Sequence, residues 1–470
     1  MRVKTLVACS LSLTLLTVGA RVEAGGLFLP FHGARGLGRA GAMVAGADDP
    51  GGIWYNPATI AAVKGRQILL DATLTLHQMS YARTDSGGNT LPEVESEPIL
   101  LPIPTLALTI PLTRDFSLGA SFSAGAGVLS GYPRPSYGVC DPTGPLRCVD
   151  TAHQDAPQRY TLVNLDGTLF LRFDMAVAWR VLSNVVVAVS LQNHMAQLRH
   201  VKVISSYNGT LSGGPEDPDF DSLVDARMSD WFNPSLSVGV LYSVLNDRLK
   251  FAATLQLPAV FEAEATLHAQ LPVSPIYAAS SVEGVRADVA LHFPLSVAAG
   301  IEWRIHPWLR VEGDVVWEQW SSLDAITFDP VDITILQLPG VGDYRIPPSK
   351  EPLGYQDSVS FRLGAEAQVS RYVLRAGYGF ELGATPLAST SVLSQDFNKH
   401  LLSVGASVEV GRWRMDAAYG VLFTAEREVD YRESDVPQVN PVNPEGAATV
   451  GGGRYSQSHH MLALGVSVRY

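Results

Sequence analysis

The sequence predicts an all-β protein, namely a 14-stranded antiparallel transmembrane β-barrel with an N-terminal hatch, or plug, inside the lumen. Three observations predict the barrel, and a glycine-rich stretch before it predicts the plug. About fourteen segments after residue 66 alternate apolar and polar residues, the connections between them alternate short and long, and aromatic residues gather beside the short connections. The composition agrees, with 46% hydrophobic and 17% charged residues and no apolar run after the N-terminus long enough for a membrane-spanning helix.

The first residues resemble an export signal. Arg2 and Lys4 precede an apolar run from Thr5 to Ala20, and Val22-Glu23-Ala24 places small residues for cleavage before Gly25. We therefore expect residues 1–24 to be removed as a signal peptide, together with Cys9. Residues 25–65 are expected to form the hatch, and residues 66–470 the transmembrane β-barrel with long external loops.

The expected hatch is rich in glycine between Gly33 and Val63, which favours irregular backbone that runs close to its neighbours. A short helix is predicted near its end. Asn56 suits the N-cap, Pro57 suits the first helical position, where its missing N–H costs nothing, and Lys64-Gly65 suits the end. The stretch is thus a compact insert that ends in one short helix.

Period-two alternation predicts the strands, because it gives each strand one apolar face and one polar face. In the fourth segment, for example, Phe173, Met175 and Trp179 share one face, while Arg172 and Asp174 share the other. The predicted segments are 67–81, 99–110, 116–130, 159–180, 184–202, 228–244, 248–266, 285–303, 308–328, 356–370, 372–385, 398–410, 412–427 and 454–470.

The lengths of the connections between strands distinguish a membrane barrel from a soluble β-sandwich. Those after the even-numbered segments are tight, such as Ser370-Arg371 and Gly411-Arg412, whereas 203–227, 329–355 and 428–453 are long and polar. Backbone polar groups at membrane depth must all be paired, and a closed sheet with short periplasmic turns and long external loops achieves this. The sequence therefore predicts a location in the outer membrane of a Gram-negative bacterium.

Aromatic residues mark one membrane interface, since they lie beside the short turns. The residues of this predicted girdle are Phe116, Trp179, Tyr242, Trp303, Trp308, Tyr372, Trp413 and Tyr470. Aromatic residues scattered through a soluble core would not gather at one end in this way.

Other function classes find little support. A formal net charge of −12 argues against a nucleic-acid partner. Cys140 and Cys148 flank a stretch of turn residues and are expected to form a disulfide in an external loop. We expect no metal site and no cofactor, because His459-His460 lacks further ligands at useful spacing, and no nucleophile elbow indicates an enzyme.

Three motifs in the hatch carry a family resemblance. They are Gly36-Leu37-Gly38-Arg39-Ala40, Ala47-Asp48-Asp49 and Asn56-Pro57-Ala58, and weaker similarity continues through strand segments such as Leu374-Arg375-Ala376-Gly377-Tyr378. With them the chain resembles the long-chain fatty acid transporter (FadL/TodX-type) family of outer-membrane proteins. The resemblance implies a fourteen-stranded barrel closed by a hatch. It also implies passive uptake of hydrophobic molecules by lateral diffusion through an opening in the wall.

The resemblance also suggests individual roles. The stretch 120–127, with Gly125 and Gly127, is similar to the place where the third strand of the family kinks inward and opens a lateral window. Lys202 is similar in position to a basic residue that meets the ligand carboxylate, and Gln192, His194 and His200 share its strand face. These four residues are the candidate ligand contacts.

Further charged residues are expected on the lumenal face, where they brace the hatch against the wall. They are Arg172, Arg310, Arg362, Arg375 and Arg414 with Asp174, Glu312, Asp314, Glu366 and Asp416. The expected partners of the protein are a long-chain fatty acid or another hydrophobic small molecule, together with outer-membrane lipid, and the protein is expected to be a monomer. Uptake of aromatic or aliphatic hydrocarbons, and a surface barrel that transports nothing, are the alternatives.

Overall fold

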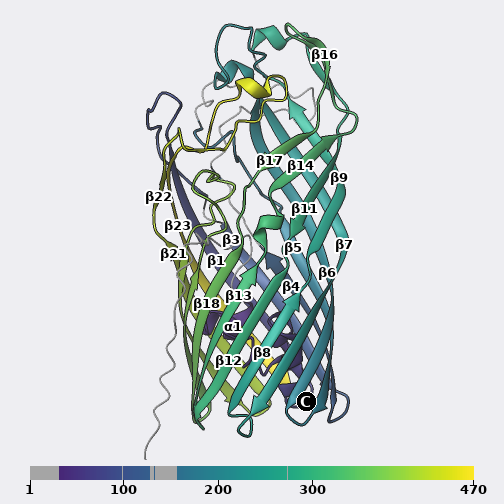
Figure 1. Ribbon diagram of the computed structural model, residues 1–470, viewed down its shortest axis with the longest axis vertical. Helices are drawn as coiled ribbons and strands as arrows, with labels where there is room; N and C mark the ends of the chain where they lie inside the picture. The colour runs from purple at the N-terminus through teal and green to yellow at the C-terminus, as the bar shows by residue number, and fades with distance from the viewer. Residues whose placement is uncertain (1–30, 98, 127–131, 133–155, 273) are drawn as a thin grey trace, which may run out of the picture.

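The computed structural model describes residues 31–97, 99–126, 132, 156–272 and 274–470. Its main body is a closed antiparallel barrel of fourteen strands, which are tilted against the long axis, and β1 pairs with β23 to close it (Figure 1). The strands in order are β1 (Gln67–Arg83), β3 (Ile99–Pro111), β4 (Phe116–Ala126), β5 (Leu169–Leu182), β6 (Val185–Ser205), β7 (Asp221–Val244), β8 (Leu249–Gln256) continued by β9 (Ala259–Gln270), β11 (Arg286–Phe293) continued by β12 (Ser296–His306), β13 (Leu309–Glu318) continued by β14 (Ala325–Pro330), β17 (Ser349–Pro352) continued by β18 (Ser358–Val369), β19 (Tyr372–Glu381), β20 (Lys399–Val410), β21 (Trp413–Thr424) and β23 (Gly453–Arg469).

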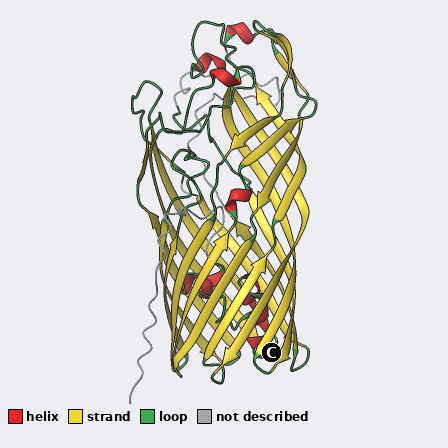
Figure 2. Cartoon of the chain, in the orientation of Figure 1, coloured by secondary structure: helices red, strands yellow, loops and turns green. Residues whose placement is uncertain are grey.

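Smaller elements lie in the hatch and at the loop end of the barrel, and one short helix lies partway along the wall (Figure 2). The added strands are β2 (Val94–Glu95), β22 (Arg427–Val429) and a separate three-stranded sheet of β10 (Ser281–Glu283), β15 (Thr334–Leu338) and β16 (Gly342–Arg345). The helices are α1 (Gly33–Gly38), η1 (Pro50–Trp54), η2 (Pro57–Ala62), η3 (Pro218–Phe220), η4 (Pro275–Tyr277), η5 (Trp320–Ser322) and η6 (Pro444–Gly446). Among the described helices, none has the length and apolar character needed to span a membrane.

The barrel is inside-out relative to a soluble protein. In β5, Met175 is 57% exposed and Trp179 is 46% exposed, whereas Arg172 and Asp174 are buried in the lumen. The predicted girdle is confirmed, because all eight of its aromatic side chains are at least 41% exposed beside the short turns. An apolar outer band of this kind is typical of transmembrane barrels. The C-terminus lies at the short-turn end (Figure 1).

Away from the short turns, the barrel continues beyond this apolar band. There several outward side chains are charged and exposed, among them Glu262, Glu264, Asp288 and Asp329. The predicted seventh, eighth and ninth strands are each interrupted near this boundary. Pro258 and Pro294 lie at two of the interruptions, where proline cannot donate to the ladder.

Some predicted bounds were wrong. The fourth strand begins at Leu169, since residues 159–168 form turns rather than strand, and β7 begins at Asp221 within the predicted loop 203–227. The three-stranded sheet and most of the short helices were not predicted. The predicted helix is a 3₁₀ helix that ends at Ala62 rather than at Lys64-Gly65, and its cap is as predicted: the backbone N–H of Ala58 donates to Asn56 Oδ1 at 3.0 Å.

Residues 31–65 occupy the short-turn half of the lumen, where α1 is seen inside the barrel (Figure 1). Helix α1 packs against β19, β20, β21, β23 and β1, and η2 packs against β4, β5, β6 and β7. All six residues of α1 are buried. The segment expected to be the hatch is therefore enclosed by the wall on several sides.

Candidate functional site

Ion pairs tie the hatch to the wall. Arg39 is fully buried, and its guanidinium lies 2.5 Å from Glu312 and 3.7 Å from Glu302. Arg35 contacts Asp48 at 2.6 Å and Asp49 at 2.7 Å within the hatch. The predicted bracing role is seen for Arg310, which reaches Asp48 at 3.2 Å, and for Arg414, which reaches Asp49 at 3.1 Å.

Carboxylates of the wall also satisfy the irregular hatch backbone. Glu312 accepts hydrogen bonds from the N–H groups of Ala45 and Gly46, at 2.6 and 3.1 Å. Asp314 accepts from Met43 and Val44, at 2.8 and 3.1 Å. Because a buried N–H without a partner is costly, these bonds let a segment with little regular structure remain inside the barrel.

Glycine is required where the hatch meets its neighbours. A Cβ on Gly36 would lie 2.0 Å from the Tyr55 hydroxyl, and a Cβ on Gly377 of β19 would lie 2.3 Å from the Arg39 carbonyl carbon. Gly38 similarly packs against Gly405 of β20. The remaining hatch-motif residues Asn56, Pro57 and Ala58 are buried, so this half of the lumen is tightly filled.

A lower cavity of about 850 Å³, open space included, lies on the side of the hatch away from the short turns. The hatch contributes Val44, Trp54 and Tyr55, and the wall contributes a mixed polar and apolar lining. Arg172 stacks over the Trp54 ring at 3.4 Å and pairs with Asp174 at 3.0 Å. The other lumenal groups include His194 and Arg362.

An aromatic cluster, defined by Phe170, Phe261 and Phe293, lies farther from the short turns. The ring centroids of Phe293 are 5.1 Å from Phe170 and 4.9 Å from Phe261. Phe170 and Phe293 line the lower cavity, and the same hydrophobic core includes Ala226 and Phe328, which line a second pocket above. The cluster thus separates two compartments of the lumen.

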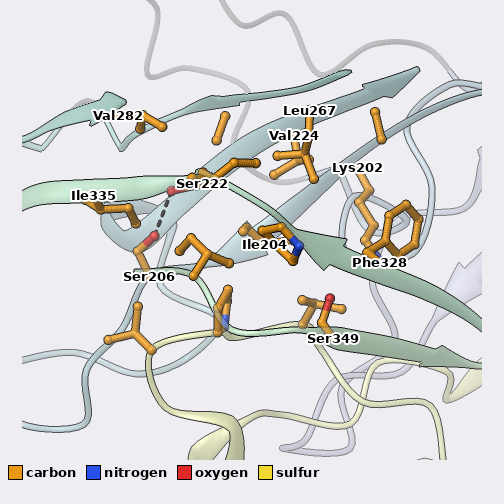
Figure 3. Close-up of a pocket in the computed structure, with 18 of the residues that line it drawn as sticks. Lys202, Ile204, Ser206, Ser222, Val224, Leu267, Val282, Phe328, Ile335 and Ser349 are labelled. Carbon is orange, nitrogen blue, oxygen red and sulfur yellow. Dashed lines mark hydrogen bonds between the residues drawn. The ribbon is translucent and has the colours of Figure 1, made fainter. Parts of the chain in front are cut away.

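The upper pocket holds about 880 Å³, open space included, and lies in the charged extension of the barrel (Figure 3). Its lining is mostly aliphatic, and Val224, Leu267, Val282, Phe328 and Ile335 surround the space. Ser206 and Ser222 satisfy each other through a hydrogen bond of 2.7 Å between their hydroxyls. This combination of apolar walls and few polar groups is typical of a site for an apolar ligand.

One ion pair lies in the upper pocket. Lys202 Nζ donates to Glu351 Oε2 at 2.7 Å, and His200 Nδ1 lies 3.8 Å from the same oxygen. Glu351 belongs to β17, outside the apolar band. Burial by itself would raise the pKa of the Glu351 carboxyl, but the Lys202 ammonium, aided by His200, outweighs burial and lowers this pKa below its ordinary value.

The four candidate ligand contacts are all buried on the lumenal face, yet they lie at different levels. Lys202 and His200 line the upper pocket, and His194 lines the lower cavity. Gln192 donates to Asp174 Oδ1 at 3.0 Å. Sequence reasoning missed Glu351 and the aromatic cluster, because these residues come from strands distant in sequence.

The wall is interrupted beside the predicted lateral window. The register between β4 and β5 shifts between Ala124 and Ala126, so that Gly125 is left out of the ladder as in a β-bulge. Within the described residues, β3 and β4 pair only as far as Thr105 with Ser123, although β3 begins at Ile99. Gly127 and the predicted disulfide of Cys140 with Cys148 lie outside the described residues.

A second seam is interrupted between β7 and the neighbouring strand formed by β8 and β9. Met228 pairs with Ala265 and Ser237 pairs with Gln256, and next to the second pair the Leu257 N–H donates to the Leu236 carbonyl oxygen at 2.9 Å, but no strand pairing joins residues 229–235 to this neighbour in the fully described stretch. The β7 side carries Phe232, whose side chain is 76% exposed. Elsewhere in the described part of the chain, no group of three or more His, Cys, Asp or Glu residues is placed to hold a metal ion.

The barrel has an apolar outer band, a segment held by ion pairs at one end of its lumen and an apolar pocket at the other. These features define the class of outer-membrane transport barrels. A family model described as "Outer membrane protein transport protein (OMPP1/FadL/TodX)" matches residues 15–141 and 168–469, which is most of the chain, and the protein belongs to this family. The family resemblance and the outer-membrane location expected from the sequence are therefore confirmed. A search of curated proteins finds no match.

Solved structures support the same fold. A Pseudomonas aeruginosa FadL homologue superposes with a TM-score of 0.73 at 16% identity, covering 95% of this chain and 100% of that chain. The Ralstonia pickettii toluene transporter TbuX has a TM-score of 0.59 at 17% identity, covering 94% and 99%. The Pseudomonas putida toluene transporter TodX has a TM-score of 0.60 at 15% identity, covering 96% and 99%. At these identities the likeness establishes the fold.

Proposed function

We propose that this protein carries hydrophobic molecules passively across the outer membrane and releases them sideways through the barrel wall. The upper pocket is the observation that supports this proposal best, because it presents an aliphatic lining around a space at the external end of the barrel, about 880 Å³ with open solvent included. The hatch fills the opposite end of the lumen with charged and polar contacts. A water-filled diffusion pore would need that same space.

In the proposed route, the upper pocket captures a molecule and the lower cavity receives it after the aromatic cluster rearranges. Each methylene group moved from water into the apolar pocket contributes about 0.8 kcal/mol. The molecule then leaves the lumen beside β4, where Gly125 forms the bulge. The concentration gradient supplies the driving force.

Two ligand classes suit this route. Long-chain fatty acids are the class expected from the position of Lys202, and the lower cavity adds the guanidinium of Arg362. Aromatic or aliphatic hydrocarbons are the second class, favoured by the aliphatic upper pocket and by likeness to two proteins described as toluene transporters. The proposal also includes removal of residues 1–24, a hatch of residues 25–65, a monomer surrounded by outer-membrane lipid, and no enzymatic activity.

The exit can be tested by filling the window with branched side chains. Gly125→Val combined with Gly127→Val is expected to reduce uptake of a radiolabelled hydrophobic substrate at least tenfold while the barrel still folds. Gly313→Val is the matched control, because the nearest atom of the described residues that are not adjacent in the chain, the Arg362 carbonyl oxygen, lies 4.0 Å from a Cβ placed there. Undiminished uptake in the double variant would remove the β4 window from the route and direct attention to the seam between β7 and β9.

The alternative hypothesis, a surface barrel that transports nothing, makes a different prediction. Under that hypothesis the purified protein would show no saturable binding of fatty acids or hydrocarbons. Saturable binding that competes between members of the two ligand classes is the result expected from the proposed function. Its absence for every apolar ligand would overturn the proposal.

A further inference from the structure

We propose that Glu351 is a specificity-determining residue, which neutralises Lys202 and makes the upper pocket select uncharged apolar molecules over carboxylates. This inference rests on the proposed function and names the ligand class of the same pocket. It differs from the expectation that Lys202 receives the head group of a fatty acid. The reason is that the positive charge of Lys202 is already paired with Glu351.

The geometry of the pair leaves little for a ligand. Lys202 is 7% exposed, and its ammonium is 2.7 Å from Glu351 Oε2, which is the distance of a strong charge-assisted hydrogen bond. His200 Nδ1 lies 3.8 Å from the same Glu351 oxygen, and His200 Nε2 contacts the Thr161 carbonyl oxygen at 3.2 Å. A ligand carboxylate that approached Lys202 would meet the negative charge of Glu351 at the same point.

The remaining lining does not supply a replacement charge. Lys350 also lines the pocket, but its side chain is exposed, so that solvent screens its charge. Ser206 and Ser222 are hydrogen-bonded to each other. The other lining residues are apolar or offer uncharged groups, among them Ile204, Val224 and Leu267. An uncharged ligand therefore loses no solvation of a charge on entering, whereas a carboxylate loses solvation without gaining a free cation.

Glu351 is distant from Lys202 in sequence, and only the folded barrel brings the two residues together. It lies 149 residues after Lys202 in sequence, in β17, which pairs with β14 in the extension of the barrel. Replacing its carboxylate with an amide keeps the shape of the side chain and releases Lys202. Glu351 is thus the residue whose change should convert the pocket from one ligand class to the other.

The experiment compares ligands of equal chain length, dodecan-1-ol and dodecanoate, by equilibrium binding to the purified full chain at pH 7.4, where the acid is ionised. We expect the wild type to bind the alcohol more tightly than the acid. Glu351→Gln should raise the ratio of acid affinity to alcohol affinity about tenfold, because Lys202 then faces the ligand without its counter-ion. Lys202→Met with Glu351→Gln should abolish that gain.

Arg362→Gln serves as the control for binding in the lower cavity, and it should leave the effect of Glu351→Gln unchanged. An unchanged ratio in Glu351→Gln, or a wild-type preference for dodecanoate that Lys202→Met removes, would overturn the assignment while leaving the proposed transport of hydrophobic molecules intact. Failure of every variant to bind either ligand would instead contradict the proposed function itself, and with it this inference.

Discussion

The two halves of the lumen differ in how they use charge. In the half near the short turns, buried arginines and carboxylates join hatch to wall in a dense network, with Arg39 and Glu312 at its centre. In the upper half, an aliphatic pocket contains the single close ion pair of Lys202 with Glu351 among its described lining residues. The same strands build both halves. Ion pairs therefore hold the hatch in place near the short turns. In the upper pocket, the pairing of Lys202 with Glu351 cancels their charges and leaves an apolar site.

The largest expected effect comes from breaking the network in the hatch half. Arg39→Met leaves Glu312 and Glu302 buried without this guanidinium, and loss of one partner from a buried pair costs about 3–5 kcal/mol. We expect the hatch to become susceptible to protease and ion conductance to appear in planar bilayers. Arg39→Met with Glu312→Gln should recover part of the loss. If Arg39→Met shows no ion conductance and its hatch stays protected from protease, the ion pairs of Arg39 do not hold the hatch in place.

A smaller effect is expected from crowding the hatch without changing charge. Gly377→Val places a side chain against the Arg39 carbonyl carbon and the Ala40 nitrogen, at 2.3 and 2.4 Å from the new Cβ. Backbone atoms cannot yield as a flexible side chain would, so the cost should be about 1–3 kcal/mol. Protease protection of residues 31–65 measures it, with Gly313→Val as the control for a valine in a strand. Equal protection in both variants would show that the hatch is not closely packed.

The upper half is tested by filling its pocket. Val224→Trp should lower the affinity for an apolar ligand about tenfold, because the ligand loses contact area, while the hatch keeps its protection and the bilayer stays silent. Equilibrium binding measures the loss of ligand affinity, and conductance of the same preparation shows whether the hatch still closes the lumen. A variant that conducts ions would indicate that the two halves are coupled rather than independent.

The smallest effect is a pH dependence of the upper half. The pKa of Glu351 is lower in the folded protein than in the unfolded chain, so its stabilising contribution is present above the unfolded pKa, which is about 4.3, and is lost as the pH falls through the lower folded value. Acidification should therefore increase cleavage of the loops around β17. In Lys202→Met this acid effect should be weaker, and an equal effect would assign the acid sensitivity to other groups.

The sequence predicts the architecture well, because each rule involved is local. Alternation along a strand such as β5 depends on neighbouring residues, and the short turns depend on a few residues each. The cap formed by Asn56 was predicted for the same reason. The interruptions at Pro258 and Pro294 were missed although proline gave a usable signal.

The site was predicted less completely than the fold. All four candidate ligand contacts are lumenal, as alternation in β6 implies, but alternation fixes the face of a residue and not its partner. Lys202 could be placed on the correct face, whereas its neutralisation by Glu351 depends on a loop-connected strand far away in sequence. The roles of Gly125 and Gly127 as a lateral window stay a prediction, as does the disulfide of Cys140 with Cys148.

The hatch also constrains the order in which the chain assembles. Arg39 precedes its partner Glu312 by 273 residues, and Arg35 precedes Glu366 by 331 residues. The leading segment thus emerges long before the carboxylates that receive it, and its cations stay hydrated until late strands arrive. Binding of the hatch and closure of the barrel by pairing of β1 with β23 thus become linked final steps of assembly. A barrel that has not closed would therefore also lack a bound hatch.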